Sequence, residues 1–329
     1  MISAEHLTKR FGAFTAIEDV SFTVGRGEII GFLGPNGAGK TTTMRVLAGV
    51  FPPTHGTATV AGYDVVRDSL RARSVVGYFP ERVSLYLDMT VARYLAYVAE
   101  MKGLSRRSAR QEIAQAIANC SLAPVAHRII GTLSKGYRQR VGIAQALVGS
   151  PRVLILDEPT SGLDPEQVSE MRALIRGLHG DRTVILSTHI LSEVEATCDR
   201  VIIINQGRIL AVDTPANLNH RLRRTSEVHL EVVGPATDVV RRLGQVPGVV
   251  SIEHRSGADG AVALVIRTER DRDAREALAA AVTQAGWGLR ELRPVLLSLE
   301  EIFLSLVAAR TATATDSEAR DEVSGYLPA

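Results

Sequence analysis

The feature that most constrains the fold is a glycine-rich stretch, GPNGAGKT at residues 34–41. Directly before it, EIIGFL (28–33) is an apolar run of the kind that forms a buried strand, and TTTMRVLAGV (41–50) after it favours a helix. A strand that runs through a glycine-rich loop into a helix is typical of α/β folds with a parallel sheet. The stretch therefore predicts an α/β protein with this loop at the carboxyl end of a buried strand.

The loop has the composition of a phosphate cradle. Its glycines allow backbone N–H groups to turn inward around phosphate oxygens, and the start of the following helix adds the positive end of its dipole. The residues assigned to the cradle are Gly34, Pro35, Asn36, Gly37, Ala38 and Gly39. Lys40 is expected to bridge the β- and γ-phosphates, Thr41 to bind Mg²⁺ and Thr42 to contact the α-phosphate. A glycine-rich turn that matches by chance is the alternative, which the flanking strand and helix disfavour.

A second motif, RVLILDEPT (152–160), is an apolar run followed by two acids. This pattern predicts a buried parallel strand that delivers carboxylates at its carboxyl end. Asp157 is expected to hold Mg²⁺ through water, and Glu158 to accept a proton from the attacking water as a general base. Acids that merely end a strand and face solvent are the alternative for this motif taken alone.

The composition limits the partners that the chain can have. With 38 basic and 36 acidic residues in 329, the net charge of +2 is too close to neutral for a protein that binds along the phosphate backbone of a nucleic acid. Apolar runs such as VIII (201–204) are far shorter than the roughly 18 residues of a membrane span, and no signal peptide is expected at the N-terminus. Two cysteines exclude a disulfide framework. These features predict a cytoplasmic protein with one large and one smaller domain.

With these motifs in place, about residues 2–220 resemble the nucleotide-binding subunit of ABC transporters. LSKGYRQR (133–140), which alone could be a solvated basic helix face or a nucleic-acid patch, is similar to the family signature LSGGQ. Ser134 and Gly136 are kept, whereas Lys135 and Tyr137 depart from the signature. The resemblance implies ATP and Mg²⁺ as cofactors, with this segment facing the γ-phosphate of ATP held by a second subunit.

Four further residues take roles from the resemblance. Phe11, in TKRFG, stands at the position of the aromatic that stacks on adenine, and Glu81 stands where the family usually has the Q-loop glutamine, near Mg²⁺. Asp164, in SGLD, matches the D-loop aspartate, and His189 matches the switch histidine that contacts the γ-phosphate. Taken singly, Phe11 is more typical of a core residue and His189 of a structural histidine. Their order along the chain favours the functional roles.

The resemblance also implies the architecture. Residues 1–222 are expected to form a P-loop NTPase cassette with a RecA-like core, an antiparallel β subdomain and a helical subdomain at about 84–150. Residues 223–310 show a β-α-β-β-α-β pattern, which predicts a small α+β, ferredoxin-like domain, and 311–329 have the composition of a disordered tail. A last helix is expected over 297–310, where SLEEIFLSL (298–306) resembles the closing motif of the subgroup that serves type-2 export permeases.

The implied function is that of an ATPase subunit. Two copies, or one copy and a related cassette, should bind ATP head to tail, with Lys40, Glu158 and His189 as the catalytic residues. The helical subdomain should dock on separately encoded membrane permease subunits, which holds the protein on the inner face of the membrane and drives export. A soluble ABC-type ATPase acting on nucleic acid or ribosomes is the alternative from another class. A nucleotide-dependent binding module without turnover is disfavoured because Glu158 is present.

Overall fold

The computed structural model describes residues 1–222, 226–256, 261–269 and 273–295. Its contacts divide the chain into two units, Met1–Pro215 and Ala216–Ala329, each with its own hydrophobic core. The helix predicted over 297–310 and the tail predicted over 311–329 lie outside the described residues. Within the described part of the chain, no helix combines the length and the apolar composition needed to cross a membrane.

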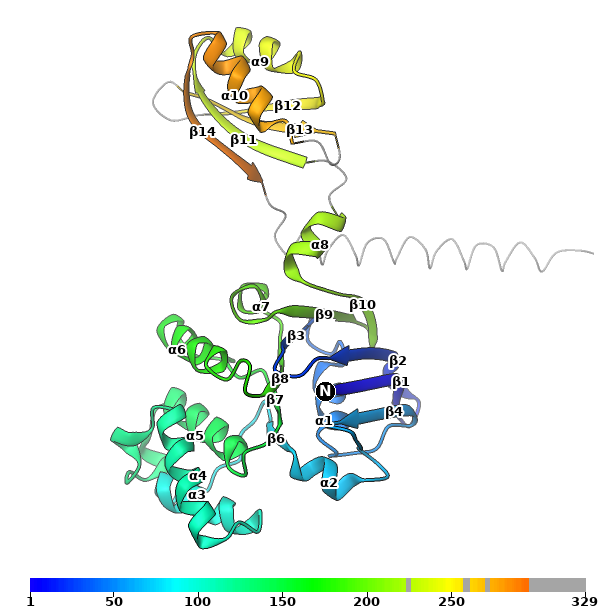
Figure 1. The fold of residues 1–329 in the computed structure, drawn as a ribbon, viewed down its shortest axis with the longest axis vertical. Helices are drawn as coiled ribbons and strands as arrows, with labels where there is room; N and C mark the ends of the chain where they lie inside the picture. The colour runs from blue at the N-terminus through cyan, green and yellow to red at the C-terminus, as the bar shows by residue number, and fades with distance from the viewer. Residues whose placement is uncertain (223–225, 257–260, 270–272, 296–329) are drawn as a thin grey trace, which may run out of the picture. The chain divides into compact units, whose positions relative to one another are not determined.

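The first unit is built on a six-stranded sheet (Figure 1). In spatial order its strands are β10 (Arg208–Asp213), β9 (Arg200–Asn205), β3 (Ile29–Leu33), β8 (Thr183–Thr188), β7 (Val153–Asp157) and β6 (Val76–Phe79). All neighbours are parallel except β10, which joins β9 through a tight turn at Gln206 and Gly207, both at positive φ. Every residue of β3, β7 and β8 is buried, as the apolar runs predict. The carboxyl ends of β3, β6, β7 and β8 therefore meet at one edge of the sheet.

A second, antiparallel sheet covers one face of the central sheet (Figure 1). Its strands are β2 (Phe14–Val24), β1 (Ile2–Phe11), β4 (His55–Val60) and β5 (Tyr63–Asp64), and α2 (Ser69–Ser74) follows them. Helix α1 (Lys40–Leu47) packs Met44 and Leu47 into the same core as Phe32 of β3. This core fixes the base of the glycine-rich loop, because the loop joins β3 to α1.

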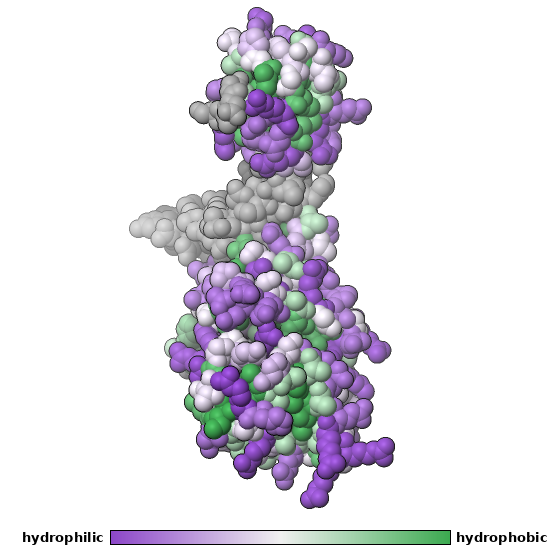
Figure 2. All heavy atoms as spheres, turned by 90° about the vertical axis from the view of Figure 1, so that its left-hand side faces the viewer, coloured by the Kyte–Doolittle hydropathy of each residue, from purple (hydrophilic) through white to green (hydrophobic). Residues whose placement is uncertain are grey.

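Helices cover the opposite face. They are α3 (Val91–Met101), α4 (Arg106–Asn119), α5 (Lys135–Leu147), α6 (Pro165–Arg176) and α7 (Leu191–Thr197), with short 3₁₀ turns η1 (Ala123–Val125) and η2 (Ile130–Thr132). The side chains of Thr90 and Ser105 cap α3 and α4, and both helices lie within the region of about 84–150 that was expected to form a helical subdomain. Figure 2, which views the molecule from the side of these helices, shows apolar side chains at the surface of the first unit among hydrophilic ones.

The second unit begins with α8 (Pro215–Leu222), whose first residue still belongs to the first unit, and continues as a β-α-β-β-α-β fold. Its elements are β11 (Ser226–Val233), α9 (Ala236–Gly244), β12 (Val249–Ser256), β13 (Val262–Thr268), α10 (Arg275–Gln284) and β14 (Gly288–Val295). The strand order is β12-β13-β11-β14, and all neighbours are antiparallel. The predicted ferredoxin-like topology is thus confirmed. Leu230 and Leu264 pack against the helices, so alternate residues of β11 lie on the opposite face.

Candidate functional site

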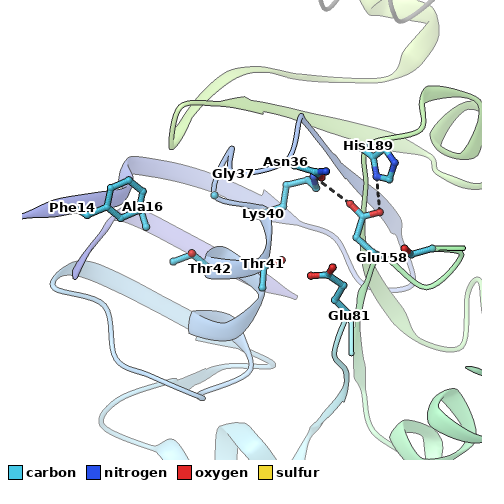
Figure 3. Close-up of a pocket in the computed structure, with 12 residues that line it drawn as sticks. Phe14, Ala16, Asn36, Gly37, Lys40, Thr41, Thr42, Glu81, Glu158 and His189 are labelled. Atoms are coloured by element: carbon cyan, nitrogen blue, oxygen red, sulfur yellow. Dashed lines mark hydrogen bonds and ion pairs between the residues drawn. The ribbon is translucent and has the colours of Figure 1, made fainter. Parts of the chain in front are cut away.

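The parallel strands deliver polar side chains to one cavity of about 370 Å³ at their shared edge (Figure 3). Glu81 follows β6, Glu158 follows β7, and His189 follows β8. The other lining residues come from the glycine-rich loop, α1, β2 and the loop after β7: Phe14, Ala16, Asn36, Gly37, Gly39, Lys40, Thr41, Thr42 and Ser161. Gly34, Pro35 and the buried Ala38 complete the loop without lining the cavity. The structure therefore brings together residues from four separate sequence motifs.

Backbone geometry explains the glycines of the loop. Gly37 and Gly39 have φ of 81° and 103°, which side-chain-bearing residues rarely adopt. A Cβ on Gly39 would lie 2.8 Å from the carbonyl oxygen of Ala16, and one on Gly34 would lie 2.3 Å from that of Ile204. Helix α1 begins directly after Gly39 with neither a capping side chain nor an acid in its first turn. The N–H groups at this helix start can therefore serve an anion.

Lys40 is held under the loop by three oxygens. Its ammonium donates to the carbonyl oxygens of Gly34 at 2.7 Å and Pro35 at 3.2 Å, and it lies 3.2 Å from Oε1 of Glu158. The side chain is only 5% exposed, so this positive charge acts in a poorly solvated place. A phosphate group in the cradle would meet the ammonium at close range.

Asp157 is completely buried at the end of β7. The hydroxyls of Thr41 and Ser187 donate to its Oδ1 at 3.1 and 2.6 Å, whereas Oδ2 is buried without a hydrogen-bond partner among the described residues. Burial raises the pKa of Asp157, and the negative charges of Glu81 and Glu158 raise it further, against the two hydroxyl bonds. A cation bound at Asp157 would favour the charged carboxylate and so offset the burial and the neighbouring negative charges. The oxygens of Asp157 and Thr41 therefore fit a hard divalent cation.

Glu158 lies between two partners. Its Oε1 faces Lys40, and its Oε2 lies 2.9 Å from Nδ1 of His189 (Figure 3). The residue has φ of 51°, an uncommon conformation for a residue with a side chain. Its N–H donates to the hydroxyl and the carbonyl oxygen of Ser187, at 3.0 and 3.2 Å, which holds the turn. Backbone strain of this kind persists where the surrounding contacts hold the residue in place, and it is common at functional sites.

The turn that carries His189 has an anchor that the sequence analysis missed. The hydroxyl of Thr188 donates to Oε2 of Glu193 at 2.7 Å and accepts a hydrogen bond from the N–H of Ile190 at 3.0 Å. Glu193 is only 2% exposed, whereas the His189 side chain is 46% exposed. Thr188 and Glu193 thus fix the backbone on both sides of an imidazole that remains accessible. The signal was an acid four residues after the histidine.

The signature segment forms a second cavity, of about 480 Å³, in the same unit. Ser134 caps α5 by accepting from the N–H of Tyr137, and Asp164 caps α6 by accepting from the N–H of Gln167. Both residues line this cavity together with Gly136, where a Cβ would lie 2.6 Å from Oε1 of Gln167. None of the three lines the cavity of Lys40 and Glu158. The predicted residues therefore fall into two separate half-sites within one chain.

Phe11 lies outside the lining of the loop cavity. Its ring packs edge-on against Phe51, with centroids 5.6 Å apart, and the ammonium of Lys9 lies 5.2 Å from its centroid. Phe14, at the start of β2, lines the cavity instead and is 65% exposed (Figure 3). The resemblance pointed to the aromatic before the β1–β2 turn, but its contacts with Phe51 and Lys9 leave Phe14 as the aromatic at the cavity.

Comparisons with known proteins agree with this arrangement. A family profile described as ABC transporter matches residues 17–161. The linearmycin resistance ATP-binding protein LnrL of Bacillus subtilis is 35% identical over 71% of this chain and 76% of its own length. The Nod factor export ATP-binding protein I of Ralstonia nicotianae is 33% identical over 93% of both chains. A solved structure of an ATP-binding subunit of an ABC transporter has a TM-score of 0.61 and 30% identity, and covers 67% of this chain and 92% of its own.

Proposed function

The chain belongs to the ABC transporter family as an ATP-binding, ATP-hydrolysing subunit, and we propose that two copies close head to tail on ATP to drive export through a separate membrane permease. The observation that carries this proposal is the division of the predicted residues into two cavities. Lys40, Thr41 and Glu158 line one cavity, and Ser134 and Gly136 line the other. A symmetric pair of subunits would place the second half-site of one copy over the first half-site of its partner.

Catalysis in this dimer would rest on positioning and charge. Lys40 and the N–H groups at the start of α1 would hold the β- and γ-phosphates. Glu158 would accept a proton from the attacking water on its carboxylate, and His189 would orient that water. Loss of the γ-phosphate would remove the contact to Ser134 and Gly136 of the other subunit, so that the dimer opens.

We assign Mg²⁺ to Thr41, Asp157 and Glu81. The support is the buried oxygen Oδ2 of Asp157, which has no hydrogen-bond partner in the described part of the chain, beside the Thr41 hydroxyl; Thr41 and Glu81 line one cavity. When bound, Mg²⁺ would supply positive charge against the phosphates. Glu81 offers a full negative charge where the family usually has a neutral amide, so it should hold the ion more strongly.

The permease would dock beside Glu81. A cavity of about 660 Å³ runs from Glu81 along the following loop to α5, lined in part by Leu85, Leu87 and Lys135. Leu87 is 50% exposed, and the next residue before it, Tyr86, is 52% exposed, so apolar side chains are available on this loop. An amphipathic helix of the permease could bury them in a helix-in-groove contact. The protein would then lie in the cytoplasm, on the inner face of the membrane.

The proposal is tested by purifying the tagged protein from gently solubilised cells of its own host and identifying what copurifies by mass spectrometry. We expect a polytopic membrane protein in the eluate. The variant Leu87→Asp, which places a negative charge on the exposed apolar loop after Glu81, should lose that partner while it still binds ATP. If ribosomal proteins or DNA copurify and no permease does, the assignment as an ATPase would stand, but the assignment to a transporter would be wrong.

Phe14 should contribute to ATP binding through its ring. Phe14→Ala is expected to raise the Kd for ATP about 5- to 150-fold, because stacking between a base and an aromatic ring contributes about 1–3 kcal/mol. Phe11→Ala is the matched control and should change Kd less than about twofold. Titration with a fluorescent ATP analogue compares the two variants. If Phe11→Ala has the larger effect, the adenine lies where the family resemblance put it.

Glu81→Gln should raise the Mg²⁺ concentration that ATP hydrolysis requires. The variant loses one negative charge near the ion, so the Mg²⁺ concentration for half-maximal ATPase activity is expected to rise about three- to tenfold. Glu100→Gln, at an exposed position of α3, is the control. An unchanged Mg²⁺ requirement would remove Glu81 from the metal site.

A further inference from the structure

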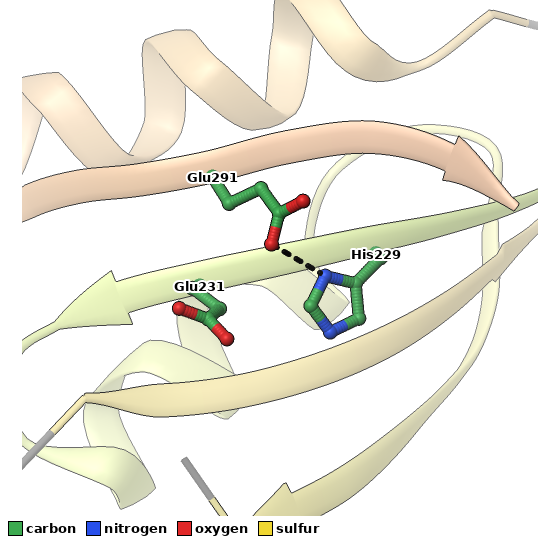
Figure 4. A group of neighbouring side chains, drawn as sticks. All are labelled: His229, Glu231 and Glu291. Carbon is green, nitrogen blue, oxygen red and sulfur yellow. Dashed lines mark ion pairs between the residues drawn. The ribbon is translucent and has the colours of Figure 1, made fainter. Parts of the chain in front are cut away.

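Three side chains of the second unit converge at one point, outside both half-sites. His229 and Glu231 come from β11 and Glu291 from β14 (Figure 4). His229 and Glu231 are two residues apart on one strand and therefore share a face of the sheet. Glu291 is the direct cross-strand partner of Glu231. One ligand atom from each of the three lies within 4.8 Å of the other two.

The two carboxylates form an unfavourable pair. Like charges directly opposite each other on neighbouring strands destabilise a sheet. Arg293 lies 2.6 Å from Oε1 of Glu291 and so neutralises one side of that carboxylate. Glu231 has no ion pair or hydrogen bond from its side chain to any other described residue, although it is half-buried. The position between Glu231 and Glu291 therefore favours a cation.

The imidazole completes a set of ligands. Nδ1 of His229 is buried and lies 3.3 Å from Oε2 of Glu291, without hydrogen-bond geometry to any group in the described part of the chain. Its side chain is only 17% exposed. The neighbouring Arg267 is engaged with Glu227 at 2.8 Å and Glu253 at 3.2 Å, so it does not neutralise the cluster. A buried ring nitrogen thus faces Glu291, and the imidazole and the two carboxylates each offer a ligand atom within 4.8 Å of the others.

From these contacts we propose that His229, Glu231 and Glu291 bind a divalent transition metal ion of the Zn²⁺ type. One imidazole nitrogen and two carboxylate oxygens are ligands that Zn²⁺ accepts, at about 2.0–2.2 Å, with water in the remaining position. Mg²⁺ and Ca²⁺ prefer oxygen ligands, so the imidazole selects against them. The ion would join β14, the edge strand, to β11 and remove the repulsion between the glutamates.

Zinc binding by the full-length, nucleotide-free protein tests the proposal. In competition with a chromogenic zinc chelator, the wild type should bind one equivalent of Zn²⁺ that His229→Ala does not bind. Glu231→Gln keeps the shape of the side chain and should weaken this equivalent at least tenfold. His254→Ala, which removes an exposed histidine of the same unit, should bind like the wild type. Any zinc bound at the nucleotide site is common to all four proteins. The difference in bound zinc between the wild type and the cluster variants therefore measures binding at His229, Glu231 and Glu291.

Thermal unfolding provides a second readout, because a ligand that binds only the folded state raises Tm. Zn²⁺ should raise Tm of the wild type and of His254→Ala more than that of His229→Ala, and Mg²⁺ at the same concentration should not reproduce this difference. Equal zinc binding by the wild type and His229→Ala would overturn the proposal. An equal loss of zinc binding in His229→Ala and His254→Ala would also overturn it, and so would displacement of the zinc by an excess of Ca²⁺.

Discussion

Glu158→Gln is expected to abolish ATP turnover while ATP binding is preserved. The substitution keeps the size of a side chain that is 9% exposed between Lys40 and His189, but the amide cannot accept the proton of the attacking water. Loss of a positioned general base costs about 10²–10⁴-fold in rate. Removal of the negative charge that faces Lys40 should also tighten ATP binding. Phosphate release measures the rate, and titration with labelled ATP measures the affinity.

The same variant should accumulate as a dimer. Because closure requires ATP and opening requires its hydrolysis, a form that binds without hydrolysing should remain closed. Light scattering after gel filtration with Mg²⁺ and ATP is expected to show a dimer for Glu158→Gln and a monomer without nucleotide. Glu195→Gln, at an exposed position on α7, is the control and should behave like the wild type. Hydrolysis by Glu158→Gln at the wild-type rate would show that another group accepts the proton.

Lys40→Ala is expected to lose ATP binding. The ammonium is 5% exposed, and hydrogen bonds to charged groups contribute about 1.5–3 kcal/mol each. Loss of two such bonds to the phosphates should raise the Kd for ATP at least about a hundredfold. The variant should be monomeric at ATP concentrations that close the wild type. Titration with labelled ATP checks the affinity.

Two further variants separate charge from geometry at this position. Lys40→Arg keeps the charge but places a larger, planar group where the ammonium reaches the carbonyl oxygens of Gly34 and Pro35. We expect it to bind ATP poorly as well. Arg71→Ala, at an exposed position of α2, removes a positive charge elsewhere and should bind normally. Wild-type affinity in Lys40→Ala, with its fold intact by circular dichroism, would show that the loop does not hold the phosphates through this residue.

Local patterns were sufficient for much of the fold. The apolar runs before residues 34 and 157 predicted β3 and β7, because a strand buried on both faces cannot tolerate polar side chains. The helical subdomain expected at about 84–150 contains α3, α4 and α5. The alternation of strands and helices after residue 225 predicted the topology of the second unit. All of these signals follow from the order of residues along the chain, without contacts between distant segments.

Contacts between distant segments were beyond such patterns. Phe11 and Phe14 are both aromatic, lie three residues apart, and differ only in what the rest of the fold brings beside them. Ser187 lies 30 residues from the Asp157 that it serves as a hydrogen-bond donor. Glu231 and Glu291 lie 60 residues apart and meet only through the register of β11 and β14.

The sequence by itself determined the loop, the order of the motifs and the class of chemistry, because a phosphate cradle needs glycines, a lysine and a hydroxyl at consecutive positions of one chain. The tertiary structure determined which of the functional residues line the same cavity. Parallel strands bring Glu81, Glu158 and His189 to the cavity of Lys40, whereas Ser134, Gly136 and Asp164 line another. Sheet register likewise decided that His229 meets two glutamates, since side-chain contacts across strands depend on pairing and not on spacing along the chain.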